Sequence, residues 1–154
     1  MRNGANSLEI AALVDSLMRN EVTGEAWFDF GRNPDGTEQI GRALAAKTTV
    51  FQATAVVSWL APEETVLAHI VARELDTMRT GVELDLGLFT IESEPPAGSV
   101  VLLVSTFWGG QRPLRSLRTL FEARGHTVVA AASLVRPAHA AIGAEDFPLV
   151  TLID

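Results

Sequence analysis

Apolar and polar residues alternate along this chain at two spacings, one typical of helices and one typical of strands. Asn6 and Glu9 form a capping-box pattern, and apolar residues then recur at helical spacing as far as Asn20, which predicts a first helix. Further helices are predicted over residues 37–47, 65–75 and 113–124. Gly125, directly after the last of these, is a typical helix stop.

Short apolar or alternating runs between these helices predict strands. They cover residues 25–30, 55–59, 77–83, 99–105, 127–134 and 148–153, the last as an edge strand. Residues 100–104 are apolar without interruption, which favours a strand covered on both faces, as in a parallel sheet. Because strand and helix alternate, we expect one α/β domain over residues 1–154, with a doubly wound, mostly parallel sheet flanked by helices.

In a doubly wound sheet, ligands bind at the carboxyl ends of the strands, near the point where the strand order reverses. Two loops follow predicted central strands, at residues 59–64 and 105–112. We therefore expect any ligand site of this domain to be built from these two loops.

The composition narrows the possible partners. The formal net charge of −7 repels nucleic acid and anionic membranes at long range, so neither is expected as a partner. No apolar run approaches the roughly 20 residues that cross a bilayer, and no apolar signal core follows the first residues. The chain has no cysteine, which excludes disulfides, and we expect a cytoplasmic protein.

Residues 99–125 join a buried strand to a loop and a helix, and another apolar strand follows directly. Upstream, residues 55–75 combine a strand, a loop and a helix that ends in Val-Ala-Arg-Glu-Leu75. In order and spacing, both stretches resemble the type I phosphoribosyltransferases, with the orotate phosphoribosyltransferases as the nearest branch. The spacing from Ser105 to Gly125 matches that pattern without a gap.

The resemblance implies a site for phosphoribosyl pyrophosphate and magnesium, and this chain departs from the family pattern there. The family has two acidic residues that contact the ribose and stabilise the developing oxocarbenium ion, at the positions of Ser105 and Thr106. The family's Thr-Thr-Gly-Gly-Ser phosphate loop is replaced by Gly109-Gly110-Gln111-Arg112-Pro113. The glycines still allow the backbone to approach an anion at a helix N-terminus.

Two further elements of the family site are also changed. The pyrophosphate loop, rich in small residues in the family, aligns with Pro62, Glu63 and Glu64. Two carboxylates would then face the most negative part of the substrate, and each like-charge pair costs on the order of 4 kcal/mol at about 4 Å and an effective dielectric constant near 20. The family's mobile basic loop corresponds to residues 81–94, which are acidic and contain no lysine.

Several residues remain candidates for contacts with a ligand. Trp59 and Trp108 each follow a predicted central strand, so they either stack on a flat ligand or fill the cleft that the lost substrate leaves. Arg112 is the best single candidate for a phosphate or carboxylate contact, whereas Arg115 and Arg118 suit a solvated helix face. The candidate set is Ser105, Thr106, Trp108, Gly109, Gly110, Gln111, Arg112 and Trp59.

Glu63 and Glu64 are candidate metal ligands or general bases. The alternative is that they form an acidic first helical turn that suits the helix dipole. The three histidines have no ligand spacing, which argues against a histidine metal site.

Together these departures predict a protein with the phosphoribosyltransferase fold but no catalytic residues and no cofactor. We expect a binding, regulatory or structural module, homodimeric as the family commonly is, with a phosphorylated small molecule or a protein as partner. One alternative is a divergent phosphoribosyltransferase that uses magnesium and a nucleobase such as orotate. Another is a subunit that pairs with an active relative and modulates it.

Overall fold

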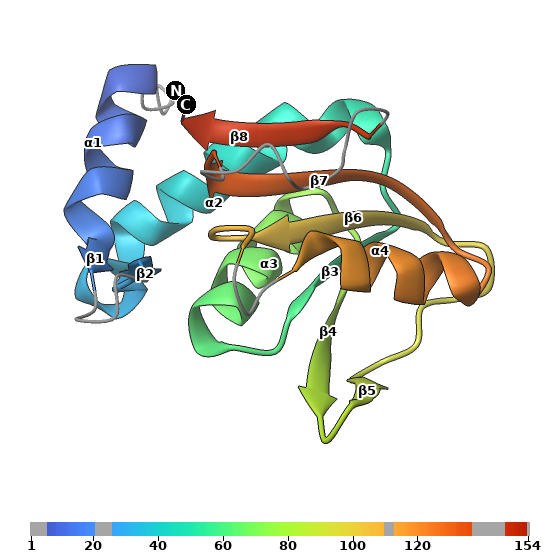
Figure 1. Cartoon of the computed structure of the whole chain (residues 1–154). Helices are drawn as coiled ribbons and strands as arrows, with labels where there is room; N and C mark the ends of the chain where they lie inside the picture. Colours follow the sequence, from blue (N-terminus) through green and yellow to red (C-terminus); the bar gives the residue numbers. More distant parts are fainter. Residues whose placement is uncertain (1–5, 21–25, 110–112, 137–146, 154) are drawn as a thin grey trace.

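The computed structural model of this chain describes residues 6–20, 26–109, 113–136 and 147–153, and its main element is a six-stranded sheet in the order β5-β4-β3-β6-β7-β8 (Figure 1). The strands of this sheet are β3 (Ala55–Trp59), β4 (Met78–Asp85), β5 (Leu88–Ile91), β6 (Val100–Ser105), β7 (Thr127–Val135) and β8 (Leu149–Ile153). All neighbouring strands pair in parallel except β4 and β5, which form an antiparallel hairpin.

Helices cover both faces of this sheet. They are α1 (Ser7–Leu17), α2 (Pro34–Thr48), α3 (Pro62–Glu74) and α4 (Leu114–Ala123), with short 3-10 turns at Phe30–Arg32 and Thr49–Phe51. Buried side chains of α1, α2 and α3 pack in one hydrophobic cluster with one face of the sheet, and those of α4 pack in a second cluster with the other face. Among the described helices, none is both long and apolar enough to cross a membrane.

The connections confirm the doubly wound α/β fold expected from the sequence. Helix α3 links β3 to β4 on one side of the sheet, and α4 links β6 to β7 on the other. Since β3 and β6 are neighbours, the strand order reverses between them. The carboxyl ends of β3 and β6 therefore form the position where such a sheet binds ligands.

Several expected element boundaries were wrong. The first helix ends at Leu17 rather than near Asn20, because the next three residues adopt an extended conformation. They form β1 (Met18–Asn20), which pairs with β2 (Ala26–Phe28) in a two-stranded sheet. Helix α2 begins at Pro34 and α3 at Pro62, each about three residues earlier than expected, since proline is well suited to the first helical turn.

The hairpin strand β5 and the start of α4 also differ from expectation. Residues Leu88–Ile91 were expected to lie in a loop, but they pair with β4. Pro113 was expected as the first residue of a helix, and it is instead the residue that caps α4. The strand Ala55–Trp59 and the edge position of β8 are confirmed.

Gly41 sets the distance between α2 and α3. A Cβ atom built at this position would lie 2.4 Å from Cγ2 and 2.8 Å from Cβ of Ile70 on α3. Both atoms belong to the rigid branch of the side chain, so the two helices must separate to accept even a methyl group.

We predict that Gly41→Ala lowers the free energy of unfolding by about 1–3 kcal/mol, the usual cost of an overpacked core. Gly31→Ala is the matched control, because no atom lies within 4 Å of the place that its Cβ would occupy. Urea denaturation followed by far-UV circular dichroism measures both variants. Equal stability of the two variants would contradict this explanation of the helix packing.

Candidate functional site

The candidate site lies where the loops after β3 and β6 meet. Trp59 ends β3 and Ser105 ends β6, and the two strands are parallel neighbours, so both loops leave the same edge of the sheet. The loop after β3 is short, because α3 begins at Pro62. As a result, the first turn of α3 faces the loop that follows β6.

Glu64 connects these two loops. Glu64 is the third residue of α3, and its side chain is completely buried. Its carboxylate accepts hydrogen bonds from the backbone N–H of Thr106 at 3.0 and 3.2 Å, and another from the Thr106 hydroxyl. The loop after β6 is thereby tied directly to the helix that follows β3.

The position of Glu64 has a physical reason. A buried carboxylate is costly unless several donors surround it, and Thr106 supplies two donors from one residue. The amino end of a helix also favours negative charge, and no side chain caps α3 at Ala61. On the other side of Thr106, its carbonyl accepts from the N–H of Leu134 on β7, so the residue is fixed from both directions.

Ser105 is also engaged inside the protein. Its hydroxyl donates to the carbonyl of Phe107 at 2.8 Å and accepts from the N–H of Phe107 at 3.2 Å. Both bonds close a tight turn at the end of β6. The side chain is completely buried. Ser105 and Thr106 are at the family's two acidic positions. Ser105 forms hydrogen bonds within its own turn, and Thr106 forms hydrogen bonds with Glu64.

Trp108 fills the core beneath the loop. Its side chain is only 1% exposed and belongs to the cluster under α4. The indole N–H donates to the carbonyl of Ala132 on β7 at 3.2 Å. Gly109 follows with φ of 152°, and a Cβ there would lie 3.0 Å from the ring of Phe107. Trp108 is therefore a buried core side chain rather than a residue presented to solvent.

Trp59 is placed differently. It is 7% exposed, and its indole N–H has no hydrogen-bond partner in the part of the chain that the structure describes. Its ring contact is with Phe89 of β5, at 6.2 Å between centroids, rather than with Trp108. The hairpin is therefore in contact with the end of β3.

The remaining candidates divide into described and undescribed residues. Gly110, Gln111 and Arg112 lie outside the described residues. Arg118 pairs with Glu122 at 2.9 Å and lies 4.4 Å from the ring centroid of Phe147, whereas Arg115 is exposed. Within the described segments, no group of three or more His, Asp or Glu side chains is placed to hold a metal ion.

The bond between Glu64 and Thr106 is the feature that the sequence did not reveal. The sequence offers Glu64 either as a metal or catalytic residue or as part of an acidic helix start, and the structure places it with Glu63 in the first turn of α3, completely buried. Forty-two positions separate the partners, so no local pattern joins them. The sequence offers one hint of this bond: an acidic residue at position 64 occurs together with neutral residues at positions 105 and 106.

Removing this bond should destabilise the domain. Glu64→Ala leaves the two Thr106 donors without this acceptor, so we expect a loss on the order of 2–4 kcal/mol in the free energy of unfolding. Thr106→Val removes only the hydroxyl and should cost about 1.5–3 kcal/mol, because the lost bond is to a buried carboxylate. Urea denaturation of both variants and the double variant gives the coupling between the residues. Strictly additive losses would rule out the bond between the Thr106 hydroxyl and the Glu64 carboxylate, and the exposed Glu83→Gln serves as control.

No protein-family model matches the chain, and no curated protein matches it in sequence. Solved structures do match. A phosphoribosyltransferase from Corynebacterium diphtheriae is 25% identical, with 96% of this chain and 94% of that chain covered and a TM-score of 0.73. Orotate phosphoribosyltransferase from Mycobacterium tuberculosis, in complex with inorganic phosphate, is 20% identical, with 96% of this chain and 94% of that chain covered and a TM-score of 0.70.

UMP synthase from Leishmania donovani is similar too, at 17% identity and a TM-score of 0.72. The match covers 98% of this chain but only 36% of that longer chain. The strand order, the helices on both faces and the position of the two loops agree with the resemblance found in the sequence. This chain therefore has the fold of the type I phosphoribosyltransferases, which orotate and adenine phosphoribosyltransferases share.

Proposed function

We propose that this chain is a non-catalytic protein with the phosphoribosyltransferase fold that works as a binding, regulatory or structural module. The observation that carries the proposal is the buried carboxylate of Glu64 on the N–H and hydroxyl of Thr106. The phosphoribosyltransferases that the sequence resembles have acidic residues at the end of β6, where they contact the ribose. Here residue 106 is neutral, and its N–H and hydroxyl bind a carboxylate of the protein itself.

The same bond favours a neutral residue at position 106, one of the family's two acidic positions. A carboxylate at residue 106 would lie beside the Glu64 carboxylate, at a repulsion of about 4 kcal/mol for a separation near 4 Å. Glu64 and an acidic residue 106 are therefore incompatible in this geometry. Once Glu64 occupies the interior, the residues that stabilise an oxocarbenium ion in the family have no place.

The acidic hairpin supports the proposal in a second way. The segment that corresponds to the family's mobile basic loop forms β4 and β5, and its exposed side chains include Glu83 and Asp85 but no lysine or arginine between residues 81 and 94. Such a hairpin repels pyrophosphate instead of neutralising it.

The proposal includes a homodimer in a cytoplasmic setting, as the family resemblance and the absence of cysteine suggest. A phosphorylated small molecule that contacts Arg112 and the neighbouring glycines, or a protein, is the proposed partner.

The competing function is that of a divergent phosphoribosyltransferase, with magnesium held through Glu63 or Glu64, as the fold of the solved relatives allows. Burial of Glu64 and its bonds to Thr106 weigh against that role.

Phosphoribosyl pyrophosphate with magnesium tests the proposal directly. A ligand at 100 times its dissociation constant adds about 2.7 kcal/mol to the free energy of unfolding, which a thermal melt detects. We expect an unchanged melting temperature and no release of pyrophosphate with orotate, adenine or the other common nucleobases. An active orotate phosphoribosyltransferase measured in parallel verifies the assay. Turnover that disappears in Ser105→Ala or Arg112→Ala would overturn the proposal.

A further inference from the structure

The outer edge of β5 is an open sheet edge. Strand β5 is the last strand on its side of the sheet, and its one neighbour is β4. The residues Leu88–Ile91 include no charged residue, proline or bulge, which are three of the features that protect such an edge; a fourth, shortness, is present, since β5 has four residues. Figure 1 shows the β4-β5 hairpin extending away from the rest of the sheet.

The pairing register shows which backbone groups are available. The N–H of Glu92 donates to the carbonyl of Gly81 at 2.9 Å, so these two residues form a hydrogen-bonded pair of the antiparallel ladder. Along an antiparallel ladder, hydrogen-bonded pairs alternate with pairs that are not hydrogen-bonded. The pairs that contain Ile91 and Phe89 are therefore not hydrogen-bonded to β4. The N–H and C=O groups of Phe89 and Ile91 therefore point outward, where a further strand would bind them.

The two faces of the hairpin differ in chemistry. Leu84 and Phe89 are directly opposite in the register and lie on the face of Trp59, which contacts the Phe89 ring. They are 52% and 37% exposed, so this face is apolar and only partly covered. Since side chains alternate along a strand, Glu83 and Asp85 lie on the opposite face.

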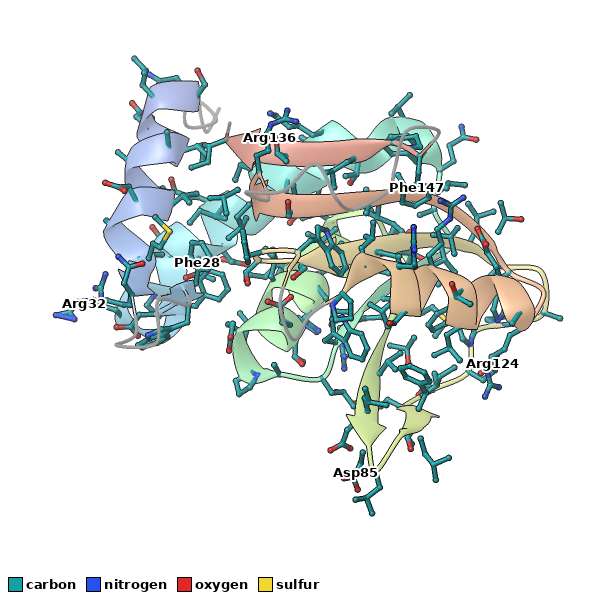
Figure 2. The ribbon with its side chains drawn as sticks, viewed as in Figure 1. Phe28, Arg32, Asp85, Arg124, Arg136 and Phe147 are labelled. Carbon is teal, nitrogen blue, oxygen red and sulfur yellow. The ribbon has the colours of Figure 1, made fainter. Side chains whose placement is uncertain are left out.

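The acidic face is not neutralised by the described part of the protein. Glu83 and Asp85 are exposed and form no ion pair with any described residue, whereas Glu92 pairs with Arg79 at 3.1 Å. Figure 2 shows Asp85 at the far end of the hairpin. A strand that pairs with β5 would lie beside Phe89 and Ile91 on one face and beside Leu88 and Thr90 on the other, with Glu83 and Asp85 one strand further in on that second face.

We propose that the outer edge of β5 binds an extended segment of a partner protein in which apolar and basic residues alternate. The segment adds a seventh strand to the six-stranded sheet through the backbone groups of Phe89 and Ile91. Its apolar side chains pack beside Phe89 and Ile91, and its long basic side chains extend across Leu88 and Thr90 toward Glu83 and Asp85. A second copy of this chain fits less well, because it brings the same carboxylates and a net charge of −7.

This proposal names a partner for the binding role proposed above and rests on that role, but its test does not involve phosphoribosyl transfer. The probe is the acetylated and amidated peptide Lys-Val-Arg-Ile-Lys-Val-Arg, titrated into the full chain by isothermal calorimetry. The matched control peptide has the same sequence with N-methyl groups on alternate residues, which keeps charge and apolar surface but blocks strand pairing. We expect the control peptide to bind at least about tenfold more weakly, because it loses several hydrogen bonds.

Two pairs of variants test the surface itself. Phe89→Pro removes the outward N–H and should weaken peptide binding about tenfold relative to Phe89→Ala, which removes the ring but keeps the N–H. Replacing Glu83 and Asp85 by lysine should weaken binding by about the same factor, whereas Asp15→Lys on α1 should have little effect. Circular dichroism of each variant confirms that the domain is folded.

Each outcome decides the proposal. Saturable binding that depends on the peptide N–H groups, on the N–H of Phe89 and on the two carboxylates supports it. Equal affinity for both peptides, equal affinity of Phe89→Pro and Phe89→Ala, or no saturable binding would overturn it. Light scattering is the final check, because self-association of the chain that Phe89→Pro abolishes would assign the edge to a second copy instead.

Discussion

The structure of the candidate site depends on one buried carboxylate. Glu64 is removed from water at the start of α3 and is stabilised by the N–H and hydroxyl of Thr106. This interaction joins the loop after β3 to the loop after β6, at the point where the strand order of the sheet reverses. The neutral residue at position 106, the closed turn at Ser105 and the buried Trp108 are all compatible with it, and a second carboxylate is not.

The parallel sheet and its two helical layers are shared with phosphoribosyltransferases that are 25% identical or less. A shared fold does not determine the chemistry of the site, because function depends on loops carried by the scaffold. The acidic hairpin belongs to the changed part, and its contact between Phe89 and Trp59 connects it to the same end of the sheet.

The sequence predicted the fold well because local signals were strong. Continuous apolar runs indicated the central strands, and the spacing between Ser105 and Gly125 indicated the family. Prediction failed where tertiary contacts decide the outcome. Met18–Asn20 continues a helical pattern but pairs with β2, and Leu88–Ile91 becomes a strand only because β4 is beside it. The environment of Glu64 was equally hidden, since its partner is 42 residues away.

The central claim is that Glu64 and an acidic residue 106 exclude each other, and a stability measurement on three variants tests it most directly. Thr106→Asp should lose on the order of 4 kcal/mol through repulsion between carboxylates. Adding Glu64→Gln removes that repulsion, so the double variant should be more stable than Thr106→Asp alone, although Glu64→Gln by itself is destabilising. If urea denaturation instead finds the double variant less stable than Thr106→Asp, the two carboxylates do not compete for this position and the claim is wrong.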